Sequence, residues 1–125
     1  MRIVNNKPMD VRVFKVKFLE VRNLLKNDDF QKAYYKCDKF SDKVKSMEFK
    51  AGNRYAKPEL IRLIGYVKVS LGAVYSDKNL NSLNISQRKN NNVFKGIVTN
   101  ISKIESIINK NESRTKVSLW SRIFG

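Results

Sequence analysis

The chain has 125 residues, of which 42% are hydrophobic and 30% charged, and this composition suits one soluble domain with one core. It carries 26 Lys and Arg against 11 Asp and Glu, a formal net charge of +15 at pH 7, with no His and a single cysteine, Cys37. A lone thiol forms neither an internal disulfide nor a Cys-based zinc site, and the lack of His excludes Ser-His-Asp triads and His-based metal sites. We therefore expect a protein that is not an enzyme and that needs no metal or cofactor.

Charged residues interrupt every apolar stretch among the first twenty residues, and no run of about 18 apolar residues occurs elsewhere. We therefore expect neither a secretory signal nor a transmembrane segment. A single cysteine fits an intracellular, reducing compartment. The abundance of Asn, Lys and Ile is typical of AT-rich genomes, including those of viruses, phages and plasmids.

Residues 1–9 form a polar N-terminal segment, and the first predicted helix follows over residues 10–26. Its apolar residues recur at spacings of three and four: Val11, Phe14, Phe18, Val21 and Leu25. The β-branched alternation between Val11 and Phe18 also fits a strand, and we favour the helix. Three apolar residues on the other side predict a helix that is covered on two faces: Val13, Val16 and Leu24.

The second predicted helix follows the turn and cap signal Asn27-Asp28-Asp29 and closes at Gly52-Asn53. It has a sustained apolar stripe: Phe30, Ala33, Tyr34, Cys37, Phe40, Val44, Met47 and Ala51. Cys37 lies within the stripe, where a buried and inert thiol is expected.

The third predicted helix opens at Lys57-Pro58-Glu59, with proline in its first turn. Its core face is Leu60, Ile64, Val67, Leu71 and Val74. Gly65 and Gly72 lie about two turns apart on one side, and we expect them to allow close packing of a neighbouring helix.

Residues 76–92 are polar and rich in Asn, which predicts a long flexible loop with at most a short helical turn near Leu83. A fourth helix begins near Phe94 and ends near Lys110. Residues 111–116 form a second predicted break, and residues 113–125 an amphipathic tail. Together the patterns predict an all-α single domain (1–125), an up-and-down bundle of four main helices with a short C-terminal amphipathic helix.

The net charge is the strongest functional signal. When Phe30 is set at 0° and each residue advances by 100°, five lysines of the second helix fall between about 180° and 240°: Lys32, Lys36, Lys39, Lys43 and Lys50. A phosphate backbone is a line of negative charge, and five such contacts would give a salt slope of about −4 to −5 on B-DNA. The alternative is a solvated face, because Asp28 and Asp42 lie within reach of neighbouring lysines.

Other cations could extend this surface. Arg12, Lys15, Arg22 and Lys26 form a row on the first helix, which merges with the lysine column only if the two helices have the right rotation. Arg54 and Lys57 flank Tyr55 in the turn before the third helix, an arrangement that can hold a phosphate and stack a base. Tyr35 is the best candidate for an exposed aromatic residue on the second helix.

Two hypotheses follow from these patterns. The first is a viral, phage or plasmid regulatory factor that binds RNA or DNA through phosphate contacts with low sequence specificity, with a homodimer as a further expectation. Its proposed contacts are Lys32, Lys36, Lys39, Lys43, Arg12, Lys15, Arg22, Arg54 and Lys57. The second is a non-catalytic interaction module that docks on a protein partner or an anionic membrane surface. Its docking residues would be Trp120, Ile123 and Phe124 of the tail.

Overall fold

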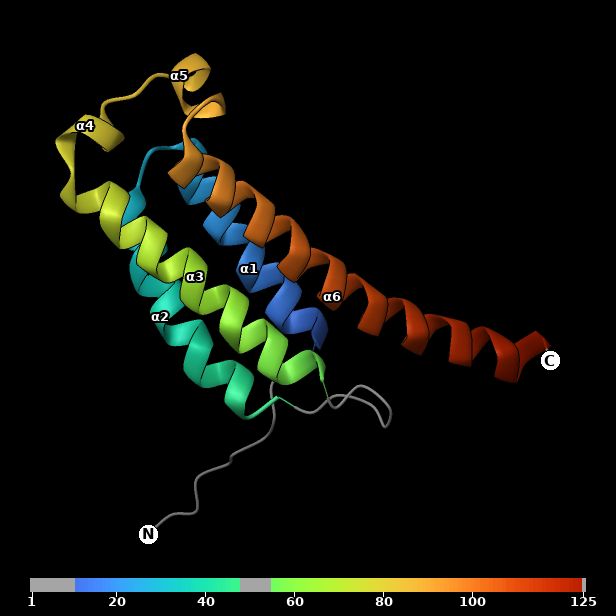
Figure 1. The fold of residues 1–125 in the computed structure, drawn as a ribbon. Coiled ribbons are helices and arrows are strands. Elements are labelled where there is room, and N and C mark those ends of the chain that lie inside the picture. The colour runs from blue at the N-terminus through green and yellow to red at the C-terminus, as the bar shows by residue number, and fades with distance from the viewer. Residues whose placement is uncertain (1–10, 48–54, 125) are drawn as a thin grey trace, which may run out of the picture.

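The computed structural model describes the backbone of residues 11–47 and 55–124, and the side chains of residues 11–47 and 55–110. Within these ranges the protein is all-α, as predicted, and has no strand (Figure 1). The four long helices are α1 (Val11–Lys26), α2 (Phe30–Lys45), α3 (Ala56–Ser76) and α6 (Asn92–Phe124). Two short helices, α4 (Lys78–Asn81) and α5 (Ile85–Lys89), connect α3 to α6.

The long helices surround one hydrophobic core. Helix α3 packs between α2 and α6, and α1 contacts these same two helices from the other side, so α1 and α3 lie diagonally opposite each other (Figure 1). Each long helix directs its apolar stripe inward. The polar segment 1–9 lies outside the described residues.

An aromatic cluster joins α1 to α2. The ring centroids of Phe14 and Phe40 lie 5.3 Å apart in an edge-on arrangement, and Phe18 lies 5.8 Å from each of them. All three rings are buried. Phe14 and Phe18 are one turn apart on a helix, whereas in a strand they would lie about 13 Å apart, so a contact of both rings with Phe40 favours the helix over the strand.

The outer face of α1 differs from the prediction. Val13 and Val16 are exposed, Val16 to 64%, and only Leu24 packs against the core. The prediction of a helix covered on two faces is therefore wrong for the described residues, because α1 is an outer helix of the group and its second apolar side faces solvent.

The turn between α1 and α2 matches its sequence signal. Asp28 has a positive φ of 59°, a conformation that Asp tolerates better than most residues. The Asp29 carboxylate accepts a hydrogen bond from the backbone N–H of Lys32 at 3.3 Å and so caps α2. Helix α2 ends at Lys45, earlier than predicted.

The two glycines of α3 have different surroundings. A Cβ atom on Gly72 would lie 3.2 Å from the Tyr34 ring of α2, so the two helices pack closely there and a larger residue would displace the ring. A Cβ atom on Gly65 would meet nothing within 4 Å. The expectation of close packing therefore holds for Gly72 and is wrong for Gly65, which lies on the outer side of α3.

Residues 76–92 are not a long loop. Asp77 caps α4 by accepting from the Asn79 N–H at 2.9 Å, and Asn84 and Gln87 form a reciprocal capping box at the start of α5. The polar residues that indicated a loop serve as helix caps.

The predicted break at residues 111–116 is also absent. The backbone of α6 is helical without interruption from Asn92 to Phe124 and passes the ends of the other helices (Figure 1). The segment contains no Gly or Pro, so its polar residues continue the helix at little cost. A separate C-terminal helix is therefore not present in the described backbone.

Candidate nucleic-acid interface

Acidic side chains are scarce, and most of them are engaged. Among the described residues, seven carboxylates form ion pairs: Glu20, Asp28, Asp29, Asp38, Asp42, Glu59 and Glu105. The remaining one, Asp77, caps α4. Because cations outnumber these acids, many lysines keep an uncompensated charge on the surface.

The predicted lysine column on α2 is divided by these pairs. Lys36 forms an ion pair with Glu20 of α1, and its hydrogen bond lowers the pKa of that carboxyl group. Lys32 lies 3.8 Å from Asp29, but its side chain remains 74% exposed. Lys39 and Lys43 are exposed and have no ion pair among the described residues. Lys50 lies outside the described residues.

Lys17 of α1 joins this surface. It lies almost one helical turn before Glu20, and its charge contributes to the lowered pKa of Glu20, which places it on the α2 side of α1. The side chain is exposed. We call the resulting set the lysine face: Lys17, Lys32, Lys39 and Lys43. Tyr35, which is exposed as predicted, lies on the same outer side of α2.

The predicted basic row of α1 lies on the opposite side of that helix. Arg22 donates two hydrogen bonds to Glu105 of α6, at 2.6 and 2.7 Å, and this contact raises the pKa of Arg22. Lys15 lines a small pocket between α1 and α6 with Asn109, and Arg12 lies at the exposed start of α1. This row therefore faces α6 and does not merge with the lysine face. Arg22 acts as a link between helices.

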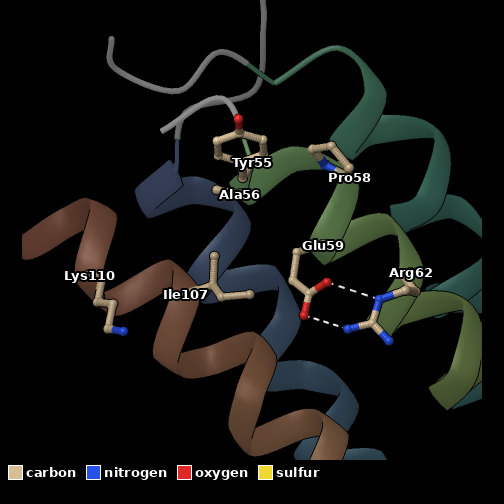
Figure 2. Close-up of a pocket in the computed structure, with 7 residues that line it drawn as sticks. All are labelled: Tyr55, Ala56, Pro58, Glu59, Arg62, Ile107 and Lys110. Atoms are coloured by element: carbon tan, nitrogen blue, oxygen red, sulfur yellow. Dashed lines mark hydrogen bonds and ion pairs between the residues drawn. The ribbon is translucent and has the colours of Figure 1, made fainter. Parts of the chain in front are cut away.

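An open pocket of about 490 Å³ lies where the start of α3 meets α6 (Figure 2). Tyr55, exposed to 78%, stands at one end, and Lys110 at another. Arg62 forms a bidentate ion pair with Glu59 at 2.5 and 2.9 Å, which lowers the pKa of Glu59. The Glu59 carboxylate projects among these cations, so the pocket suits a phosphate less well than the lysine face does.

The two predicted phosphate contacts of the turn before α3 are Lys57 and Arg54. Lys57 is half-buried in the first turn of α3, and it is not one of the residues that line the pocket. Arg54 lies outside the described residues.

Helix α2 also carries a thiol and two aspartates. Cys37 is buried, and desolvation raises the pKa of its thiol to about 12, so the thiolate does not form at neutral pH. Asp38 forms an ion pair with Lys68 at 2.6 Å, and Asp42 forms one with Lys45 at 3.7 Å. In the described part of the chain, no group of three His, Cys, Asp or Glu side chains could hold a metal ion.

The tail residues Trp120, Ile123 and Phe124 belong to the last turns of α6, and their side chains lie outside those that the structure describes. No helix in the described ranges combines the length and apolarity that a membrane span needs. The chain matches no known protein family, no curated protein and no solved structure.

Proposed function

We propose that this protein is an up-and-down bundle of four main helices that binds RNA or DNA through phosphate contacts of the lysine face. The observation that carries the proposal is a group of exposed lysines on neighbouring turns of α1 and α2 that form no ion pair with any described residue, namely Lys17, Lys39 and Lys43. Keeping such charges together costs self-repulsion, and a polyanion relieves it.

The dimensions of the lysine face suit a phosphate backbone. Lys32 and Lys43 are separated by eleven residues, or about 16 Å of helix. Four lysines that each neutralise one phosphate would give a salt slope of about −3 to −4 on B-DNA. Lys36, which Glu20 engages, supports the face by holding α1 against α2.

The side-chain chemistry favours low sequence specificity. Lysine is a compact point charge that contacts phosphate without the bidentate geometry that reads base edges. Tyr35 adds an aromatic surface beside the lysines, on which the base of a single strand can stack. Arg12, Lys15, Arg54 and Lys57 are proposed as peripheral contacts only.

The test is a binding titration against duplex RNA, duplex DNA and single strands between about 50 and 300 mM salt. We expect affinity that falls steeply with salt and depends little on sequence. The double variant Lys39→Glu with Lys43→Glu should weaken binding at least tenfold near 100 mM salt and make the slope shallower by about 2. Unchanged affinity in this variant would remove the lysine face from the site.

A control with the same change in net charge is Lys78→Glu with Lys89→Glu, because both lysines are exposed on the short helices α4 and α5. This variant should retain most of the affinity. An equal loss in both variants would mean that net charge, and not the lysine face, determines binding.

The second candidate is a module that docks through its C-terminal tail on a protein partner or an anionic membrane surface. It is favoured by the length of α6, whose backbone continues to Phe124, well beyond Ile108, the last buried residue among the side chains of α6 that the structure describes. Absence of nucleic-acid binding at about 50 mM salt would support this candidate over the first.

A further inference from the structure

The outer face of α3 is unusual for a solvent-exposed helix surface. Helix α3 is the most apolar of the long helices, and apolar residues occur around its whole circumference. Val69 is 70% exposed and Tyr66 50% exposed, and Ala73 is exposed one turn further on. Gly65 leaves open space beside them. We call this strip the α3 face: Arg62, Gly65, Tyr66, Val69, Ala73 and Ser76.

The charge of this face is balanced, unlike that of the lysine face. Arg62 is paired with Glu59 and stacks over the Tyr66 ring at 5.4 Å. Lys68, on the side of α3 toward α2, is paired with Asp38 at 2.6 Å. A molecule with a net charge of +15 therefore presents one long helix face without excess positive charge. An acidic partner would prefer the lysine face, whereas a second copy of the chain avoids like-charge repulsion at the α3 face.

We infer that the α3 face binds a second copy of this chain, with the two α3 helices antiparallel and Val69 at the two-fold axis. In that register, residues at equal distances on either side of Val69 face each other, as an isologous interface requires. Gly65 faces Ala73 of the partner subunit, so small residues meet at two symmetric positions and allow the helices to approach closely.

The same register brings opposite charges together. Arg62 faces the end of the partner's α3, where the partner's Ser76 and the partner's Asp77 lie. Asp77 is the one described acidic residue without an ion pair, and its carboxylate accepts a hydrogen bond from Asn79 only. Arg62 uses Nε and one terminal nitrogen for Glu59, which leaves donors for a second carboxylate.

The position of α3 makes such a dimer compatible with nucleic-acid binding. Helix α1 lies diagonally across the core from α3. On α2, Lys36 pairs with Glu20 of α1 and Asp38 pairs with Lys68 of α3, so the lysines that share the side of Lys36 lie toward α1 and away from α3. Two copies joined through the α3 face therefore leave both lysine faces uncovered. The strip is short for an interface, since stable dimers bury about 800 Å² on each partner. We therefore expect a dimer that dissociates in the micromolar range.

The experiment is sedimentation equilibrium of the full chain without nucleic acid, from about 5 to 500 μM and from about 50 to 500 mM salt. We expect a mass that rises toward twice 14.6 kDa with protein concentration. Dimer formation should strengthen with salt, because screening reduces the repulsion between two strongly positive copies. Nucleic-acid binding weakens with salt, whereas dimer formation strengthens. Failure of the dimer proposal is therefore distinguishable from failure of the nucleic-acid proposal.

Two pairs of variants, each a test and its control, locate the interface. Val69→Asp should keep the chain monomeric over the whole range, whereas Val98→Asp, at a similarly exposed valine of α6, should leave the dimer intact. Val69→Cys should form an intermolecular disulfide on mild oxidation, since buried Cys37 does not compete, and Val16→Cys on α1 should crosslink far less. A monomer at every concentration, a dimer that survives Val69→Asp, or equal crosslinking at positions 16 and 69 would overturn the inference.

Discussion

Arg88 is held between aromatic rings at the end of the molecule where α5 meets the α1–α2 turn. Its guanidinium carbon lies 5.3 Å from the Phe30 ring centroid and 5.0 Å from that of Phe94. It donates to the Leu83 carbonyl at 2.9 Å and to Asp28 at 2.7 Å, and its side chain is only 17% exposed. The flat guanidinium combines stacking with directed hydrogen bonds, which an ammonium group does not do.

We therefore predict that Arg88→Lys lowers the free energy of unfolding by about 1–2 kcal/mol although it keeps the charge. Urea denaturation measures the change. Lys89→Arg is the matched control, because Lys89 is exposed next in the chain and its replacement should change stability by less than about 0.5 kcal/mol. Equal effects at both positions would contradict the structural role of Arg88.

Glu20 and Glu59 make stability depend on pH below neutrality. Hydrogen bonds from Lys36 and Arg62 lower their pKa values below the ordinary 4.5. Above about pH 4.5, both carboxyl groups are ionised in the folded and unfolded states, and their stabilisation is complete. As the pH falls through the lowered pKa values, the folded state must also take up protons, and that stabilisation is lost.

The prediction is that Glu59→Gln destabilises the protein near pH 6 and that the difference from the parent chain disappears near pH 2. Urea midpoints at several pH values, with the carboxyl titrations followed by NMR, measure both quantities. A difference that does not change with pH would show that Glu59 acts through packing and not through its charge.

At the scale of the elements, α1 depends on few contacts with its neighbours. The phenylalanine cluster attaches it to α2, and the hydrogen bonds between Arg22 and Glu105 attach it to α6. The side chain of Glu105 is 27% exposed, so the pair is partly shielded from solvent. Bidentate, charge-assisted hydrogen bonds in such positions are stronger than those of exposed pairs.

We predict that Arg22→Ala lowers the free energy of unfolding by about 1 kcal/mol and leaves the salt slope of nucleic-acid binding unchanged. A double-mutant cycle with Glu105→Ala should give a coupling energy of similar size. A shallower slope in Arg22→Ala would instead assign this arginine to phosphate contact.

The ends of the helices mark the limit of what the sequence predicts. Apolar spacing identified the inward faces of α1, α2, α3 and α6, because burial of those faces drives the packing. Asn84 and Asp77 indicated a loop, but each caps a short helix. In a loop and at the start of a short helix alike, a polar side chain accepts a hydrogen bond from a backbone N–H. Composition therefore does not distinguish a loop from a capped helix.

The lysine face was predictable only in part, because the pattern within one helix does not show how that helix packs against the next. The periodicity of α2 placed Lys39 and Lys43 together correctly, since they share one helix. It missed Lys17, and it did not show that Glu20 engages Lys36, because both depend on how α1 is rotated against α2. The apolar pattern of α1 predicts that Lys17 is exposed. It does not predict that Lys17 lies beside α2, because that depends on how the two helices pack.

At the scale of the whole molecule, excess charge opposes folding. Seven of the eight described acids form single ion pairs, and the uncompensated lysines repel one another across the surface. Salt weakens both exposed attractions and exposed repulsions. With 26 basic residues against 11 acidic ones, the repulsions are more numerous.

We therefore predict that raising NaCl from about 20 to 300 mM stabilises the protein by about 1 kcal/mol, a rise in Tm of several degrees. The Tm should be measured on the Val69→Asp variant at low protein concentration, so that dimer formation does not contribute to the rise in Tm. The variant Lys39→Glu with Lys43→Glu should show a smaller rise, because two of the repelling groups have changed sign. A Tm that falls with salt would mean that attraction within the ion pairs outweighs repulsion among the lysines, which would remove the electrostatic reason for a polyanionic ligand.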